Sequence, residues 1–279
     1  MLFYLPASMI AIGGVGGSGT RVIASALQSM GFYLGSDLNQ QKDNLWFTLL
    51  FKRREVPRTS DSEFRELVEI FCDAMHGRLI VEPDRIHLVR SLAVGEREFN
   101  ENELVRPSAD TLLAARVSRP NGLVGWKEPN THIVLDRLLP LIPDLRYIHV
   151  MRNGRDMAFS RNQKQVCLWG SLITGLPYQP RPAYALHYWR KAHERINRIA
   201  RDMGDRFLLV NFEEFCGNPM EGISRIAGFA GISLDEKRRR TISAGVEMPE
   251  SVGRFRDHDL SLFDPADVAY VAGCGFPTR

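Results

Sequence analysis

Cysteine is scarce in this chain and forms no recognisable pattern. The 279 residues include four cysteines, with no CxxC pair and no Cys/His cluster (Cys72, Cys167, Cys216 and Cys274). The sequence therefore offers neither a disulfide framework nor a zinc-type ligand set. We interpret the four residues as separate reduced thiols, which favours a reducing, cytoplasmic compartment.

Long apolar runs and dense charge of one sign are lacking as well. No stretch of 18 consecutive apolar residues occurs, which argues against a membrane span. The apolar first residues have no basic start of the kind that signal peptides carry. A net charge of +3 permits an anionic ligand, but it is far from the Lys/Arg stripe of a nucleic-acid-binding protein.

Strands and helices are expected to alternate along most of the chain. Apolar stretches predict strands at 8–13, 122–127, 145–152 and 206–212, and helical periodicity predicts helices at 20–30, 131–139, 183–203, 219–230 and 235–244. This order predicts an α/β fold with a parallel sheet covered by helices on both faces. The polar segment 38–119 shows no strand alternation and is expected to be a helical insertion, with Ser60 or Asp61 capping a helix. With no repeat or linker, residues 1–279 are expected to form a single domain.

The junction between the first predicted strand and helix, GGVGGSGTR at 13–21, is rich in glycine. Backbone N–H groups and the positive end of a helix dipole meet at such a junction, where a phosphate or sulfate binds naturally. Glycines allow the backbone to approach the anion without a Cβ in the way. Ser18 and Thr20 would add hydroxyl donors and Arg21 a charged one.

Three interpretations of this loop compete. Gly14, Gly16 and Gly19 satisfy the dinucleotide GxGxxG pattern, and Asp37 lies where a ribose-binding acid is expected. Gly14 and Gly19 also have the spacing of a nucleoside-triphosphate P-loop, but Thr20 occupies the lysine position, which argues against metal-ATP. The third interpretation is a glycine turn without a ligand.

A second anion-binding signal follows the strand predicted at 145–152. Arg152 ends that strand, where open α/β sheets place ligand groups. Asn153 or Gly154 is expected to start a helix, with Ser160 about two turns into it and facing the strand end. Arg152 and Ser160 could then hold one phosphate from two directions, while Asp156 is expected to cap the helix or pair with Arg155.

These stretches together resemble the sulfotransferase family that uses 3′-phosphoadenosine 5′-phosphosulfate (PAPS). Family members carry a P-K/R-S-G-T loop for the 5′-phosphosulfate and an R-N-x-x-D-x-x-x-S stretch for the 3′-phosphate, which are similar here to residues 16–20 and 152–160. GWKEPNTH, the stretch beginning NFEEFCGNP, and SVGRFRDHDLS resemble further family segments in the same order. The resemblance covers about residues 10 to 260, is weakest from 38 to 119, and implies a bacterial-type sulfotransferase domain with a P-loop nucleoside-triphosphate-hydrolase-like fold.

The resemblance also implies roles for particular residues. The donor would be held by Gly16, Gly17, Ser18, Gly19, Thr20, Arg21, Arg152, Ser160 and Arg254, with 3′-phosphoadenosine 5′-phosphate (PAP) as the product. Gly17 stands where the family has a basic residue, so we expect Arg21 to supply that charge. Lys127 would be the cation at the transferring group, and no metal is needed because lysine and arginine neutralise the donor.

The general base stays open at the level of sequence. Many family members place a histidine two residues after the lysine, where this chain has Pro129. His132, one turn along, has a suitable ordinary pKa. Glu128 and Asp37 are the other candidates, and Glu128 could instead brace a lysine or arginine.

The acceptor pocket is expected from residues 38–119 and 167–180. Its candidate walls are also candidate core residues (Trp46, Phe47, Trp169 and Tyr178). A carbohydrate, a glycolipid or a small molecule with a hydroxyl or amine fits this expectation. Two other functions stay open: an NAD(P)-dependent oxidoreductase and a nucleotide-binding homologue without catalysis. The RRR run at 238–240 is expected to be a solvated helix face.

Overall fold

The computed structural model describes residues 9–78, 82–94 and 122–277, which form two compact units. The first unit contains the chain up to Gly13 together with Ile23–Tyr147. The second contains Gly14–Val22 and the chain from Ile148 onward. The glycine loop and the Arg152 region, which are far apart in sequence, therefore belong to the same unit.

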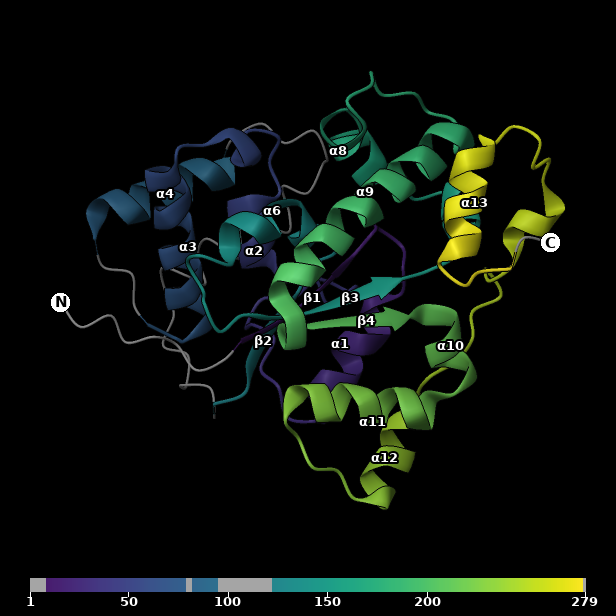
Figure 1. Cartoon of the computed structure of the whole chain (residues 1–279). Helices are drawn as coiled ribbons and strands as arrows, with labels where there is room; N and C mark the ends of the chain where they lie inside the picture. The colour runs from purple at the N-terminus through teal and green to yellow at the C-terminus, as the bar shows by residue number, and fades with distance from the viewer. Residues whose placement is uncertain (1–8, 79–81, 95–121, 278–279) are drawn as a thin grey trace. The chain divides into compact units, whose positions relative to one another are not determined.

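Four strands form one sheet in the order β2-β1-β3-β4 (Figure 1). They span β1 Met9–Gly14, β2 Val124–Lys127, β3 Arg146–Met151 and β4 Phe207–Asn211. β1 and β2 pair in parallel, with Ile12 opposite Lys127. This confirms the predicted α/β class with a parallel sheet. The strands form where short apolar runs lie between helical segments of the sequence.

The first unit surrounds its part of the sheet with helices and an aromatic core. Its helices are most of α1 (Thr20–Ser29), α2 (Leu45–Phe51), α3 (Asp61–Met75), α4 (Pro83–Val94) and α6 (Thr131–Leu138). Phe47 and Phe71 both contact the Trp126 ring, with centroids 5.9 and 5.1 Å away. The described residues between 38 and 94 form helices joined by turns and loops, with no strand element, as predicted, whereas residues 79–81 and 95–119 of the expected insertion lie outside the described residues.

The predicted cap at Ser60 is present. Its hydroxyl accepts from the Glu63 N–H at 3.2 Å, and the Glu63 carboxylate accepts from the Ser60 N–H at 3.0 Å. This reciprocal capping box satisfies two of the amides that a helix start leaves without partners, and it fixes the beginning of α3.

The second unit is built around α9 (Pro182–Met203), the longest described helix. α9 packs on α7 (Gly154–Ala158), α8 (Lys164–Thr174) and α13 (Pro265–Gly273). Asp267 of α13, only 2% exposed, pairs with Arg190 of α9 at 2.8 Å. Three further helices follow β4: α10 (Phe212–Gly217), α11 (Pro219–Ala230) and α12 (Glu236–Ser243). The positions of α9, α11 and α12 are as predicted, whereas α8, α10 and α13 were not predicted.

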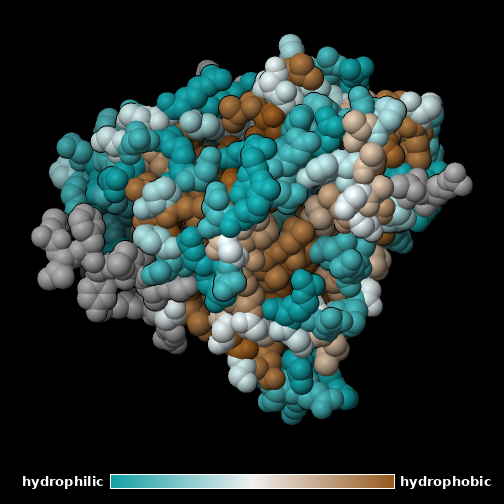
Figure 2. Space-filling view, viewed as in Figure 1, coloured by the Kyte–Doolittle hydropathy of each residue, from teal (hydrophilic) through white to brown (hydrophobic). Residues whose placement is uncertain are grey.

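The arginine run lies on α12. Arg238 and Arg240 are exposed, and Arg240 pairs with Glu236 one turn earlier. Figure 2 shows hydrophilic surface over this helix. The solvated-face interpretation is confirmed for Arg238 and Arg240, whereas Arg239 is half-buried and donates to Ser224 Oγ at 3.5 Å. None of the helices in the described part of the chain is long and apolar enough to cross a bilayer.

A buried histidine gives the second unit a predictable acid sensitivity. His193, 1% exposed, lies with its ring centroid 5.1 Å from that of His149, and its Nδ1 is 2.7 Å from the Trp189 carbonyl oxygen. Burial lowers the pKa of His193 to about 4. Since the unfolded chain titrates near 6.5, it binds more protons than the native state between these values, and stability is lost as pH falls through this window.

We expect His193→Gln to remove this part of the pH dependence. The free energy of unfolding of the wild type should fall between pH 6.5 and 4 by up to about 3 kcal/mol more than that of the variant. Denaturant unfolding at several pH values measures it, with His87→Gln on the exposed face of α4 as the control. An equal loss in wild type and His193→Gln would contradict a neutral native His193.

Candidate functional site

The glycine loop joins β1 to α1 and carries two backbone conformations that favour glycine. Gly17 has φ 91° and Gly19 has φ 92°. The Gln165 amide of α8 closes the loop from the side, because its Oε1 accepts from the Gly16 N–H at 2.8 Å and its Nε2 donates to the Gly14 carbonyl at 3.3 Å. The loop is therefore held in position by a side chain 149 residues away.

Polar groups at the start of α1 are available to a ligand. Ser18 is 1% exposed, and its Oγ has no hydrogen-bond partner among the described residues. Thr20, the first residue of α1, is 4% exposed, whereas Arg21 is exposed. A buried hydroxyl without a partner is unfavourable unless a ligand satisfies it. The loop thus fits an anion that accepts hydrogen bonds from Ser18 and from backbone amides.

Gly19 gives this loop a sharp mutational test. Its φ disfavours any L side chain, and a Cβ there would overlap the ring of Phe212. We expect Gly19→Ala to destabilise the protein by roughly 2–5 kcal/mol, from backbone strain and overpacking together. Gly228→Ala is the matched control, since that glycine lies in α11 with open space around it and alanine should stabilise the helix by about 0.5–1 kcal/mol. Equal thermal unfolding midpoints for Gly19→Ala and Gly228→Ala would contradict the positive φ of Gly19 and its close packing against Phe212.

Arg152 follows β3 and is held close to the start of α7. Asn153 caps α7 by accepting from the Arg155 N–H at 3.0 Å, which confirms the predicted helix start. The Arg152 side chain is 6% exposed, donates to Ser251 Oγ at 2.9 Å and lies 4.0 Å from Asp156. Its Nε has no hydrogen-bond partner among the described residues. A buried guanidinium with donor capacity left over is suited to an oxyanion.

The loop at 251–257 is attached to this region by Asp156. The Asp156 carboxylate accepts from the Gly253 N–H at 2.7 Å and from the Phe255 N–H at 3.1 Å. It therefore positions the segment that carries Arg254, rather than only capping α7 or pairing with Arg155. Arg254 is half-buried and donates from Nε to the Ser251 carbonyl at 3.1 Å.

Ser160 lies differently from the prediction. α7 ends at Ala158, so Ser160 is in the loop before α8 and not two turns into a helix. The reason is Gln163, whose Nε2 donates to the carbonyls of Met157 and Ser160 at 3.0 and 2.8 Å. These carbonyls would otherwise need amides of a continuing helix. In the structure Ser160 faces the glycine loop, with its Oγ 4.0 Å from the position of a Cβ on Gly17.

One phenylalanine connects the two candidate anion sites. Phe212, the first residue of α10, packs against Gly19, and the Arg152 guanidinium lies 5.3 Å from the centroid of the same ring. Within the second unit, the glycine loop and Arg152 thus both lie against the side chain of Phe212. Their arrangement fits a ligand with two anionic groups.

Comparison with known proteins agrees with this arrangement. A family model described as the sulfotransferase family matches residues 10–236, which is most of the chain. The chain belongs to the sulfotransferase family. No match to this sulfotransferase was found among curated proteins.

Solved structures share the fold at low sequence identity. The sulfotransferase domain from the Synechococcus PCC 7002 olefin synthase is 16% identical with a TM-score of 0.51, and the match covers 98% of this chain and 96% of that one. The sulfotransferase domain from the curacin biosynthetic pathway is 13% identical with a TM-score of 0.50, covering 98% and 99%. These likenesses support the predicted bacterial-type, P-loop-like sulfotransferase fold.

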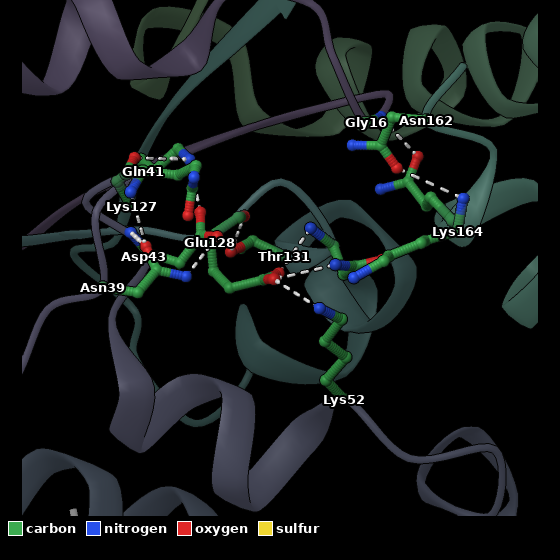
Figure 3. Close-up of polar contacts among 12 residues, drawn as sticks. Gly16, Asn39, Gln41, Asp43, Lys52, Lys127, Glu128, Thr131, Asn162 and Lys164 are labelled. Atoms are coloured by element: carbon green, nitrogen blue, oxygen red, sulfur yellow. Dashed lines mark hydrogen bonds and ion pairs between the residues drawn. The ribbon is translucent and has the colours of Figure 1, made fainter. Parts of the chain in front are cut away.

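In the first unit of this sulfotransferase, Lys127 ends β2 and is 3% exposed. Its ammonium pairs with Asp43 and donates to the Gln41 carbonyl at 3.1 Å (Figure 3). Neither partner was predicted, because no motif marks them and both lie more than 80 residues away in sequence.

Glu128 is fully buried and held by its neighbours. Its two carboxylate oxygens accept from the N–H and the Nδ2 of Asn130, and Lys52 lies 3.9 Å away (Figure 3). Burial raises the pKa of Glu128 to about 7, since desolvation outweighs the attraction of Lys52. Glu128 thus braces a lysine and can also carry a proton near neutral pH.

The remaining predicted residues are mostly in the core. His132 lies in the first turn of α6 and is 0% exposed. Trp46, Phe47 and Trp169 are buried as core residues, whereas Tyr178 is half-buried against Tyr184. Among the candidate acceptor walls, Tyr178 is therefore the one with exposed surface.

Proposed function

We propose that this sulfotransferase transfers the sulfuryl group of PAPS to a hydroxyl or amine of a carbohydrate, glycolipid or small-molecule acceptor. The observation that carries this proposal is the pairing of the glycine loop with Arg152 around Phe212, each with a buried donor that lacks a partner among the described residues. PAP has a phosphate at each end of its ribose, which matches two separate sites of positive charge.

The residues around the glycine loop have distinct roles in this proposal. The amides of residues 16–20 and the hydroxyls of Ser18 and Thr20 bind the 5′-phosphosulfate, with Arg21 adding charge from the first turn of α1. Arg152, Ser160 and Arg254 bind the 3′-phosphate. Asp156 and Gln165 do not contact the donor, and instead hold the two loops in position.

Lys127 supplies the catalytic cation. It ends β2, where it lies opposite Ile12 of β1. In the reaction, an acceptor oxygen or nitrogen forms a bond to sulfur as the bond from sulfur to the 5′-phosphate oxygen breaks. Negative charge builds on the departing oxygen, and a positioned ammonium stabilises it.

The base that takes the acceptor proton is Glu128, His132 or Asp37, and Glu128→Gln, His132→Gln and Asp37→Asn decide among them. If Glu128 is the base, Glu128→Gln lowers turnover by about 10²–10⁴ while His132→Gln does not. Because burial raises the pKa of Glu128 to about 7, wild-type turnover should then rise as pH increases through 7. A large loss in His132→Gln alone assigns the role to His132 and leaves Glu128 as the brace of Lys52.

Two experiments test the function. Calorimetric titration with PAP and with NADP⁺ should show binding of PAP alone, and binding of NADP⁺ alone would favour the oxidoreductase interpretation. Sulfur-labelled PAPS is then screened against hydroxyl and amine acceptors. Binding of PAP without transfer to any acceptor would point to a homologue that has lost catalysis.

A further inference from the structure

The ammonium of Lys127 is held by a dedicated turn. Within the described part of the first unit, residues 39–43 supply both acceptors of this ammonium, the Asp43 carboxylate and the Gln41 carbonyl. Asp43 is itself largely buried, with its side chain 16% exposed. A buried ammonium requires a counter-charge and hydrogen bonds to remain charged, and this turn provides both.

The turn is built by the side chain of Asn39. Its Oδ1 accepts from the N–H groups of Gln41 and Asp43, both at 2.9 Å, and its Nδ2 donates to Asp43 Oδ2 at 3.0 Å. Asn side chains stabilise turns in this way. Consequently Asp43 is fixed through its backbone and through one carboxylate oxygen, and the other oxygen meets Lys127.

Lys42, between Gln41 and Asp43 in this turn, is held in an unfavourable backbone conformation. Lys42 has φ 62°, the one positive φ among the described residues other than glycine. Its Nζ donates to Gln28 Oε1 of α1 at 2.5 Å, and Asn44, the residue after Asp43, donates its N–H to the Lys127 carbonyl at 2.7 Å. Strain of this kind persists where surrounding contacts enforce it.

From this geometry we propose that the 39–43 turn is a positioning element and that Asp43 is a positioning residue for Lys127. The inference rests on the proposed role of Lys127. An ammonium has three donors, and Asp43 and Gln41 take two of them. The tetrahedral nitrogen then keeps its third N–H in a fixed direction, so this donor needs no further ordering before it acts in the proposed reaction.

The reverse reaction tests this proposal without knowledge of the natural acceptor. PAP and 4-nitrophenyl sulfate are supplied, the sulfuryl group moves to the 5′-phosphate oxygen, and the 4-nitrophenolate that leaves is measured by its colour. We expect Asp43→Asn to lower kcat by about tenfold to a hundredfold, with the affinity for PAP unchanged. Asp43→Glu should recover part of the loss, and Asp73→Asn, which removes a carboxylate paired with Arg78, should change neither.

A double-mutant cycle shows whether Asp43 acts through Lys127. In the Lys127→Met background, Asp43→Asn should cause no further loss of kcat, because the side chain it positions is absent. Additive losses would overturn the proposal. Asn39→Ala, which removes the side chain that builds the turn, should resemble Asp43→Asn and provides a second variant if that protein folds poorly.

A chemical measurement gives a readout other than activity. In the free protein, Lys127 should react slowly with acetic anhydride, and Asp43→Asn should accelerate its acetylation several-fold, as measured by peptide mass spectrometry. Full turnover in Lys127→Met would overturn the proposed role of Lys127 itself. If Lys127→Met lowers kcat but Asp43→Asn has normal kcat and normal acetylation of Lys127, the positioning role of Asp43 is overturned. The proposed catalytic role of Lys127 would then stand.

Discussion

Replacing Arg152 with alanine should weaken PAP binding by at least about a hundredfold. A buried guanidinium bonds a phosphate through charge-assisted hydrogen bonds, and losing two of these costs several kcal/mol of binding free energy. The fold should survive, because among the described residues the side chain donates one hydrogen bond, to Ser251, and the bond from Trp189 Nε1 is to the Arg152 carbonyl, which alanine keeps. Calorimetry measures the affinity and thermal unfolding the stability.

Two further variants make the Arg152 result specific. Arg152→Lys keeps the charge but loses the forked donor geometry, and its affinity should lie between those of wild type and alanine variant. Arg201→Ala removes an exposed arginine of α9 and should bind PAP as the wild type does. If Arg152→Ala binds with wild-type affinity, Arg152 is not part of the donor site.

Lys127→Met should lower turnover by roughly 10²–10³-fold and leave the affinity for PAP nearly unchanged. The loss is that expected when one preorganised donor to developing negative charge is removed. It should appear in kcat, since the interaction strengthens as the sulfur–oxygen bond breaks. Methionine preserves most of the apolar stem of this buried side chain, so the fold should be retained.

The control for this change is Lys237→Met, which removes an exposed lysine from α12. It should leave both turnover and affinity unchanged. A parallel loss of PAP affinity in Lys127→Met would assign the lysine to ground-state binding of the donor. Wild-type turnover in Lys127→Met would remove the residue from the mechanism.

The sequence predicted the strands and the longer helices well because their signals are local. Apolar runs indicate β1 and β3, and the helical periodicity of 183–203 indicates α9. The glycine loop and Arg152 were also found from local order, as each follows a strand. Short helices such as α10 contain too few turns to show periodicity, which is why they were not predicted.

The parts of the site that could not be predicted depend on contacts between distant residues. Ser160 is the local exception: it was assigned to a helix because periodicity does not show that the amide of Gln163, three residues later, takes the carbonyls at the end of α7. Asp43 beside Lys127 and Gln165 beside Gly16 are the distant partners, since their spacings of 84 and 149 residues match no motif. Such partners become recognisable only once the fold brings them together.

The most direct test of the donor site is a crystal structure of the protein with PAP. The proposal expects the 5′-phosphate on the amides of residues 16–20 with Ser18 Oγ donating to it, and the 3′-phosphate on Arg152. A nucleotide bound elsewhere, or with neither phosphate in contact with these groups, would contradict the proposed function.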